Sequence, residues 1–213
     1  MKLMTSSELP WDVPKAQHGA SVAKILEGAL RAINDLGTRR LSMSDISDAS
    51  GVSRGTLYRY FSSKEEVLAA VSEFVCLSFE DGIRAVGRDI ADPIERFRVV
   101  MRFFAGFTTD RSPERVFEVE PAFHLNFFRS HFARHKAAVR DALEPVIDHL
   151  DSLLDVPIDR DGFVETLVRL QLSTLIVPAG DGWMRFWNSA PDRLERWALK
   201  IAAGAATDHE RTN

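Results

Sequence analysis

The sequence predicts an all-α protein, and three observations support this fold class. Apolar side chains recur at intervals of three and four residues along most of the chain, which is the period of an amphipathic helix. Serine or aspartate precedes several of these stretches, and glycine or proline follows several others, as expected at helix ends. The chain has 213 residues, 45% of them hydrophobic, so it can bury a sizeable core as a small domain joined to a larger one.

The first helical pattern begins at Gly19 and ends at Gly37. Its apolar residues recur at the helical period: Val22, Ile25, Leu26, Ala29, Ile33 and Leu36. Residues 1–17 hold serine, proline and scattered charge without a sustained period, so we expect a flexible N-terminal arm there. The sequence leaves open whether Trp11 in this arm packs on the rest of the protein.

The stretch LSMSDISDASGVSRGTLYRYFSSK, residues 41–64, predicts two short helices. Ser42 can cap the first one, with Asp45 three residues later near its positive end. Gly51 can adopt the left-handed conformation that ends a helix, and Ser53 can cap the helix that follows. Two short helices in this order are the layout of a helix-turn-helix, so we expect this stretch to bind DNA.

The second short helix, residues 54–61, presents an outward face that suits DNA. Leu57 and Phe61 stand one turn apart and should face inward. The residues left on the outer side are Arg54, Thr56, Tyr58, Arg59 and Tyr60. Gly55 stands where alanine would favour the helix by about 0.8–1.0 kcal/mol, which indicates that another molecule approaches the backbone closely.

Local charge supports the same interpretation. The formal net charge is −4, yet residues 39–64 hold five basic side chains and only two acidic ones. Arg54 and Lys64 each stand in the first turn of a predicted helix, where a cation costs about 0.3–1 kcal/mol that a phosphate would offset. Each feature alone is compatible with an ordinary solvated surface. Together they favour a nucleic-acid partner.

The segment GVSRGTLYRYFSSKEEVL, with DISDASGV before it, resembles the DNA-binding signature of the TetR family of bacterial transcriptional regulators. The resemblance covers residues 18–75. It implies a homodimer whose helix-turn-helix domain, residues 18–66, binds an inverted repeat of double-stranded operator DNA. It also implies that residues 67–213 form a helical body that binds an effector and makes the dimer interface.

The signature also implies which residues touch DNA, by their position in it. They are Ser44, Ser53, Arg54, Gly55, Thr56, Tyr58, Arg59, Tyr60 and Lys64. The variable outward positions among them are assigned to bases: Ser44, Arg54, Thr56 and Arg59.

Helical patterns continue through the body. Ser63, with Glu66 three residues later, predicts the capped start of a long helix. Asp92 marks the start of the next helix. Residues 108–113 predict a loop, and residues 114–120 a short helix.

A long helical pattern follows over residues 122–155, with a break expected near Pro145. Another helix is expected over residues 162–177. Gly180 and Gly182 then predict a turn.

The aromatic residues of the body predict a pocket for an apolar or aromatic effector, and a solid aromatic core is the alternative. Its candidate walls are Phe79, Met101, Phe104, Phe107, Phe123, Phe127, Phe128, Trp183 and Trp187. Polar candidates that could orient the effector are Glu118, Glu120, His124, Asn126 and Gln171.

The last helix should be capped by Ser189, with Asp192 three residues later. Its stripe of large and small apolar residues, together with one face of the preceding helix, predicts a dimer interface with twofold symmetry. The residues of this predicted interface are Phe163, Leu167, Leu170, Thr174, Leu194, Trp197, Ala198, Ile201 and Ala205. The alternative is that both helices pack only within one chain.

Three histidines share one helical face: His124, His131 and His135. Histidines one turn apart can bind a metal ion. Arg129 and Arg134 nearby disfavour a cation, so we expect neither a metal nor another cofactor. One cysteine in the chain excludes an internal disulfide framework.

We expect a regulator rather than an enzyme, because no motif joins a nucleophile to a base. No signal peptide and no apolar run of about 20 residues is evident, so we expect a cytoplasmic protein without membrane contact. The combined interpretation is a dimeric repressor released from DNA by a hydrophobic small molecule. Two alternatives stay open: a helical enzyme that uses the aromatic pocket and histidine face, and an effector-independent DNA-binding protein of the same fold.

Overall fold

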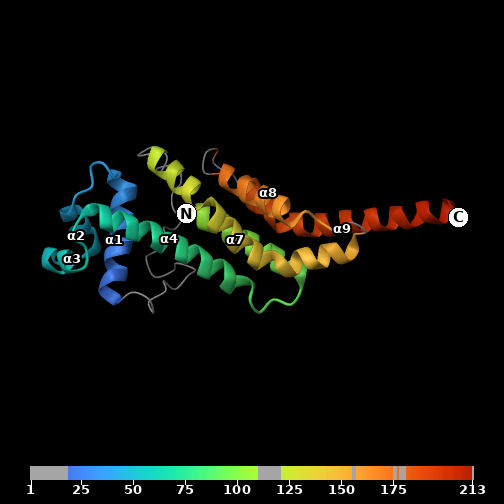
Figure 1. Cartoon of the computed structure of the whole chain (residues 1–213), viewed down its shortest axis with the longest axis horizontal. Helices are drawn as coiled ribbons and strands as arrows, with labels where there is room; N and C mark the ends of the chain where they lie inside the picture. Colours follow the sequence, from blue (N-terminus) through green and yellow to red (C-terminus); the bar gives the residue numbers. More distant parts are fainter. Residues whose placement is uncertain (1–18, 110–120, 155–156, 175–176, 178–180, 213) are drawn as a thin grey trace. The chain divides into compact units, whose positions relative to one another are not determined.

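The computed structural model describes residues 19–109, 121–154, 157–174, 177 and 181–212. These residues form helices and their connections, with no strand among them, so the all-α prediction is confirmed (Figure 1). The helices are α1 (Ala20–Leu36), α2 (Met43–Ser50), α3 (Arg54–Tyr60), α4 (Lys64–Gly87), α5 (Pro93–Thr109), α7 (Pro121–Leu153), α8 (Arg160–Ser173) and α9 (Asp181–Thr212). Within the described ranges, no helix combines the length and apolar character needed to cross a bilayer.

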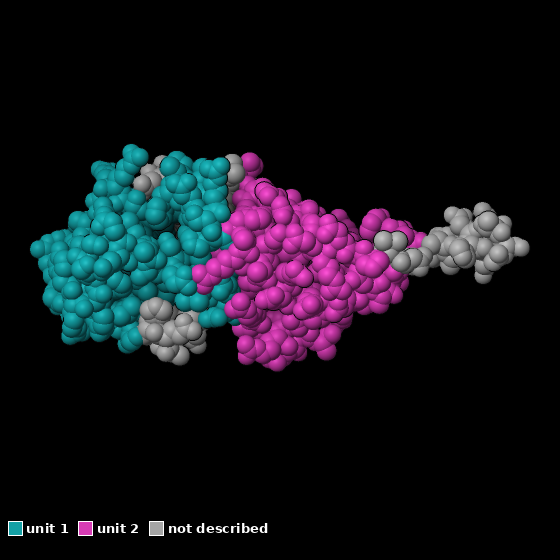
Figure 2. Space-filling view, in the orientation of Figure 1, with its two compact units in different colours: residues 1–82, 115–131 teal, residues 83–114, 132–213 magenta. Residues whose placement is uncertain are grey.

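The chain divides into two compact units (Figure 2). The first unit comprises residues 1–82 and 115–131, and the second comprises residues 83–114 and 132–213. The first therefore contains α1, α2, α3 and most of α4. The second contains α5, α8, α9 and most of α7, so the unit boundary falls within the two helices α4 and α7.

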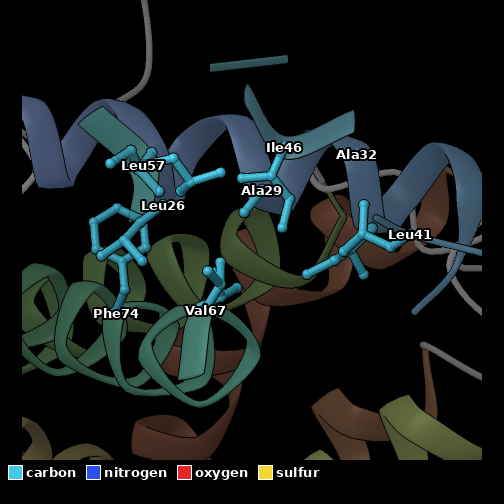
Figure 3. Packing of buried hydrophobic residues seen from close by; sticks show 11 residues of the cluster. Leu26, Ala29, Ala32, Leu41, Ile46, Leu57, Val67 and Phe74 are labelled. Atoms are coloured by element: carbon cyan, nitrogen blue, oxygen red, sulfur yellow. The ribbon is translucent and has the colours of Figure 1, made fainter. Parts of the chain in front are cut away.

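The first four helices enclose one hydrophobic core (Figure 3). The labelled side chains that meet in it are Leu26, Ala29, Ala32, Leu41, Ile46, Leu57, Val67 and Phe74. Helices as short as α2 and α3 are unstable alone, and each large apolar side chain buried here contributes about 1.5–3 kcal/mol. The shared core therefore fixes where α3 lies.

The predicted helix ends in this unit are confirmed. Ser42 Oγ accepts a hydrogen bond from the Asp45 amide at 3.3 Å, and Asp45 Oδ2 accepts one from the Ser42 amide at 2.9 Å. Gly51 ends α2 with φ of 66°, in the left-handed region. Ser53 Oγ caps α3 by accepting from the Thr56 amide at 3.1 Å.

The cap of α4 differs slightly from the prediction. Ser63 Oγ accepts from the Glu66 amide at 3.2 Å, as expected. Glu66 Oε2 accepts from the Ser62 amide at 2.7 Å, one residue earlier than in a standard capping box. Both serines therefore help to begin α4.

A close contact between α1 and α2 was absent from the predictions. A Cβ added to Gly28 would lie 2.4 Å from Ser50 Cα and 2.6 Å from the Ser50 nitrogen. Only glycine permits this approach of two backbones. A glycine inside a helical pattern is the sequence signal that could have revealed it.

The structure corrects two predictions about α5 and α7. α5 extends through Thr109, so the loop expected from residue 108 cannot begin there. The short helix expected at residues 114–120 lies outside the described residues. α7 runs unbroken from Pro121 to Leu153 with Pro145 inside it, so the break expected near Pro145 is wrong.

The bounds of α8 and α9 also differ from the predictions. α8 begins at Arg160 because Asp159 caps it through the Gly162 amide at 3.1 Å, and it ends at Ser173. α9 begins at Asp181, before the predicted cap at Ser189. Ser189 therefore lies inside α9, where its Oγ donates to the Arg185 carbonyl at 3.1 Å. Gly182, expected in a turn, belongs to α9, and Gly180 lies outside the described residues.

Candidate functional site

The side chains of α3 divide into an inner and an outer face. Leu57 is completely buried, whereas the outer face of α3 consists of the exposed residues Arg54, Tyr58, Arg59 and Tyr60. This confirms the predicted orientation of those four side chains. Thr56, also expected to face outward, is partly buried. The outer face of α3 thus presents two cations and two phenols, which suit phosphates and base edges.

Two hydroxyl groups at the start of α3 are bonded to each other. Ser53 Oγ and Thr56 Oγ1 lie 2.9 Å apart, while Ser53 Oγ also caps the Thr56 amide. A hydroxyl has one donor and two acceptor positions. Ser53 Oγ, with two partners, therefore keeps capacity for one more, and Thr56 Oγ1, with one partner, keeps capacity for two.

Arg59 is positioned by its neighbour Tyr60. The guanidinium carbon of Arg59 lies 4.9 Å from the Tyr60 ring centroid, and its Nη2 donates to Tyr60 Oη at 3.2 Å. A cation over an aromatic ring gains about 0.5–1 kcal/mol at an exposed site. The pair restricts a side chain that would otherwise sample many rotamers.

Gly55 lies in open space on α3. A Cβ added there would meet only Ser53 Oγ, at 4.0 Å. The described residues therefore give no steric reason for glycine at this position. This agrees with the expectation that the reason lies in an approaching partner.

Two other residues assigned to DNA lie at helix starts. Ser44 is partly buried in the first turn of α2. Lys64 begins α4, and its Nζ donates to the Thr38 carbonyl at 3.1 Å. Lys64 thus ties α4 to the connection between α1 and α2, a structural role that the sequence did not reveal.

A pocket of ≈520 Å³ lies beside the turn between α2 and α3. It is lined by Lys24, Glu27, Arg31, Ser50 and Gly51. Arg31 Nη2 donates to the Ala49 carbonyl at 2.8 Å, which satisfies one carbonyl at the end of α2. The charged lining does not match the hydrophobic effector that the sequence predicts.

In the second unit, three of the predicted effector residues meet. Gln171 of α8 is fully buried, and its Oε1 accepts hydrogen bonds from Trp183 Nε1 and Trp187 Nε1 of α9, both at 3.0 Å. Gln171 Nε2 donates to Thr174 Oγ1 at 3.3 Å. The amide therefore serves as a buried link between α8 and α9.

The other predicted effector residues fall into three groups. Phe79 of α4 and the α5 residues Met101, Phe104 and Phe107 are buried. In α7, paired rings have centroids 5.3 Å apart for Phe123 and His124, and 5.4 Å apart for Phe127 and Phe128. Asn126 is exposed, and Glu118 and Glu120 lie outside the described residues.

The predicted dimer residues also separate by burial. Leu167, Thr174 and Ala198 are buried within the chain. Phe163 packs on Phe97 of α5, with ring centroids 6.3 Å apart, and Leu194 is partly buried. Three large apolar residues are exposed: Leu170, Trp197 and Ile201. The side chain of Ala205 lies outside the described part of the chain.

Two histidines on the predicted histidine face of α7 lie in contact with or buried among other parts of the protein. His131 Nδ1 lies 2.8 Å from the Phe127 carbonyl, and its ring centroid is 4.6 Å from that of Phe127. His135 is buried. Among the described residues, no cluster of three or more histidine, cysteine, aspartate or glutamate side chains is placed to hold a metal ion.

Two capped short helices around a left-handed glycine, with cations on the outer face of the second, define a helix-turn-helix protein. Comparisons with known proteins agree. Residues 25–71 match the family model described as "Bacterial regulatory proteins, tetR family". The helix-turn-helix part of the chain is therefore similar to that of TetR-family regulators.

Curated relatives match the N-terminal part of the chain. The HTH-type transcriptional regulator BetI of Rhizobium meliloti is 34% identical over 93 residues, which cover 43% of this chain and 45% of BetI. The HTH-type transcriptional regulator TtgR of Pseudomonas putida is 29% identical over 99 residues, or 46% and 47% of the two chains. The chain thus spans less than half the length of these relatives, which by name are regulators rather than enzymes.

Solved structures extend the likeness to the body. Apo AibR is 25% identical with a TM-score of 0.54, covering 76% of this chain and 88% of AibR. A TetR transcription regulator from Haloarcula marismortui ATCC 43049 is 19% identical with a TM-score of 0.59. The match covers 86% of this chain and 97% of that regulator. At that identity the second likeness shows the fold alone.

Proposed function

We propose that this chain is a sequence-specific DNA-binding transcriptional regulator that acts in the cytoplasm as a homodimer. A hydrophobic or aromatic small molecule releases it from its operator, so it acts as a repressor. The observation that carries the proposal is the outer face of α3, where Arg54, Tyr58, Arg59 and Tyr60 are exposed on a helix anchored by the buried Leu57.

The nine DNA-contact assignments divide by role. Arg54 and Arg59 read base edges, since guanidinium groups match the acceptors of guanine in the major groove. Ser44 and Thr56 add base contacts. Ser53, Gly55, Tyr58, Tyr60 and Lys64 position the backbone of the duplex.

A twofold dimer requires an operator that is an inverted repeat. The two copies of α3 must lie about 34–36 Å apart, or a multiple of that distance, to enter successive major grooves on one side of the duplex. Exposed Trp197 and Ile201, one turn apart on α9, support pairing of this helix with its twin. Leu170 of α8 adds a third exposed apolar residue to the proposed interface.

The effector assignment rests on the aromatic content of the body. The first unit holds the buried Phe79 and the paired rings of α7, and the second unit holds buried rings of α5 and α9. Aromatic content of this kind favours an apolar ligand with few polar groups. AibR has been solved in complex with isovaleryl coenzyme A and operator DNA, and SmeT has been solved with triclosan. Acyl thioesters and hydrophobic phenols are therefore the first compounds to test.

Selection from a pool of random DNA duplexes tests the proposal. The full chain should enrich an inverted repeat and bind it with nanomolar affinity and a steep salt dependence. Arg54→Ala should weaken binding by about 1–3 kcal/mol. Arg140→Ala removes the same charge from an exposed position on α7 and serves as the matched control. Failure to enrich any duplex sequence would refute the assignment.

A second measurement tests the effector. Ligands that stabilise the chain in thermal unfolding should lower its affinity for the selected duplex, because a ligand that favours a different arrangement draws the population away from DNA. A ligand that stabilises the chain without changing DNA affinity would contradict release by that ligand. Strengthened binding would identify a co-repressor or activator mechanism instead.

A further inference from the structure

Two long helices of the second unit contain a proline. Pro145 lies inside α7 and Pro191 inside α9. Proline has no amide hydrogen, and its ring presses on the carbonyl four residues earlier, so the turn before it loses a backbone hydrogen bond. The carbonyl that loses this bond belongs to Asp141 in α7 and to Trp187 in α9, four residues before each proline.

Two arginines of α5 donate into these turns in the same way. Arg96 Nε donates to the Ala142 carbonyl at 2.8 Å, and Ala142 stands three residues before Pro145. Arg98 Nε donates to the Asn188 carbonyl at 3.1 Å, and Asn188 stands three residues before Pro191. The same side-chain atom thus meets the same position of two proline turns.

We propose that Arg96 and Arg98 are a pair of clasps that fasten the proline turns of α7 and α9 to α5 and hold these helices in one arrangement. The proposal concerns the second unit alone and does not depend on DNA binding.

The Arg98 clasp spans Pro191. Its Nη2 donates to Asp192 Oδ1 at 2.8 Å, directly after the proline, and its Nη1 donates to Glu95 Oε2. Burial of Arg98 alone would lower its pKa, but the hydrogen bonds and charges of Asp192 and Glu95 together raise it. The guanidinium is therefore held charged, with partners on both sides of the proline turn.

The Arg96 clasp also involves the end of α4. A Cβ added to Gly87, the last residue of α4, would lie 3.4 Å from Arg96 Nε and 3.2 Å from Val100 Cγ2. The small size of Gly87 thus lets α4 end against the clasp. A movement of α7 that displaces the Ala142 carbonyl would disturb the group on which α4 ends.

This arrangement makes Arg96 a positioning residue between three helices. The turn of α7 before Pro145 has one backbone hydrogen bond fewer and is held by the Arg96 side chain at the Ala142 carbonyl. A side-chain hydrogen bond of this kind breaks more readily than a backbone hydrogen bond fixed within a helix. α7 and α9 can therefore move relative to α5 by exchanging these two bonds for water, without unfolding either helix.

Hydrogen exchange of the full chain, read by mass spectrometry, tests the clasps. Arg96→Met should speed exchange around Pro145 by about two- to tenfold, the cost of one net hydrogen bond, and leave the Pro191 turn unchanged. Arg98→Met should speed exchange around Pro191 and leave the Pro145 turn unchanged. Arg102→Met is the control, because Arg102 lies on the same helix and forms an ion pair with Glu95 at 3.8 Å.

A double-mutant cycle separates a clasp from general packing. Pro145→Ala restores the backbone hydrogen bond to the Asp141 carbonyl. This strengthens the turn whose Ala142 carbonyl Arg96 holds, so Arg96→Met should then have a smaller effect on exchange. An equal effect of Arg96→Met with and without Pro145 would overturn the proposal, as would an equal effect of Arg102→Met. If Arg96→Met does not fold, Gly87→Ala provides the same test. It crowds Arg96 and should speed exchange at Pro145 in the wild-type background only.

Discussion

Gly28 of α1 packs so closely on Ser50 of α2 that a Cβ at Gly28 would lie 2.4 Å from the Ser50 Cα. Ser50 also stabilises the last turn of α2, because its Oγ donates a hydrogen bond to the Ile46 carbonyl at 2.6 Å. Gly51 then ends α2 and leads the chain to α3. The contact therefore sets how deep α2 lies against α1, and through α2 where α3 begins.

Gly28→Ala should destabilise the first unit. The added methyl group meets backbone atoms that cannot rotate away, so we expect a loss of at least about 1–3 kcal/mol in the free energy of unfolding. Urea unfolding followed by circular dichroism measures it. Gly55→Ala makes the same substitution in open space and is the control. Equal stability of the two variants would contradict the close contact.

Gly55→Ala should separate folding from DNA binding. Alanine favours a helix over glycine by up to about 1 kcal/mol, so this variant should be as stable as the wild type or more stable. If a duplex lies against α3 at this point, the methyl group should weaken binding by about 1 kcal/mol or more. Fluorescence anisotropy with the selected duplex checks this. Unchanged affinity would remove Gly55 from the interface.

Acid should weaken the cap of α2. Hydrogen bonds from Ser42 hold the pKa of Asp45 below its usual value. A carboxylate with a lowered folded-state pKa stabilises the folded chain above its unfolded pKa, and this contribution is lost as pH falls through the folded-state pKa. The stability difference between wild type and Asp45→Asn should therefore be largest near pH 7, begin to fall near pH 4, and vanish only below the lowered folded-state pKa. Urea unfolding at a series of pH values tests this, and a constant difference would contradict it.

The sequence predicted the first unit more accurately than the second, for a physical reason. Local groups determine both ends of α2 and the start of α3: the Ser42 cap, the left-handed Gly51 and the Ser53 cap each act within three residues. Such interactions are readable from spacing alone. The close contact of Gly28 was not predicted, because its partner, Ser50, is distant in the sequence.

In the second unit, tertiary contacts override local signals. Pro145 predicted a break in α7, and Ser189 with Asp192 three residues later predicted the start of the last helix. α7 and α9 instead continue through both prolines, and Arg96 and Arg98 each donate to a carbonyl three residues before one of them. No local pattern in the sequence reveals that an arginine of another helix donates to these turns.

Tyr60 should act on DNA through Arg59. Arg59→Ala should weaken binding by about 1–3 kcal/mol and relax the preference for one base pair. Tyr60→Phe keeps the ring beneath the guanidinium but removes the hydroxyl acceptor, so we expect a smaller loss of about 0.5–1.5 kcal/mol. In an Arg59→Ala background, Tyr60→Phe should have no further effect. Additive losses, measured by anisotropy at fixed salt, would indicate that Tyr60 contacts DNA independently.

The exposed apolar residues of α9 should hold the dimer together. Ile201 is 42% exposed and lies one turn from Trp197, which is 57% exposed. Because solvent already reaches Ile201 in the single chain, Ile201→Ser should not unfold it. It should weaken dimerisation by about 2 kcal/mol if the residue lies near the centre of the interface.

Leu125→Ser is the matched control for this substitution. Leu125 on α7 is 43% exposed, so the change in polarity and exposure is the same outside the proposed interface. Sedimentation velocity over a range of concentrations should show monomers for Ile201→Ser where wild type and Leu125→Ser remain dimeric. Ile201→Ser should also lose affinity for the inverted repeat but not for a single half-site, because only a dimer binds both halves at once. If Leu125→Ser dissociates the dimer and Ile201→Ser does not, the interface lies on α7 rather than on α9.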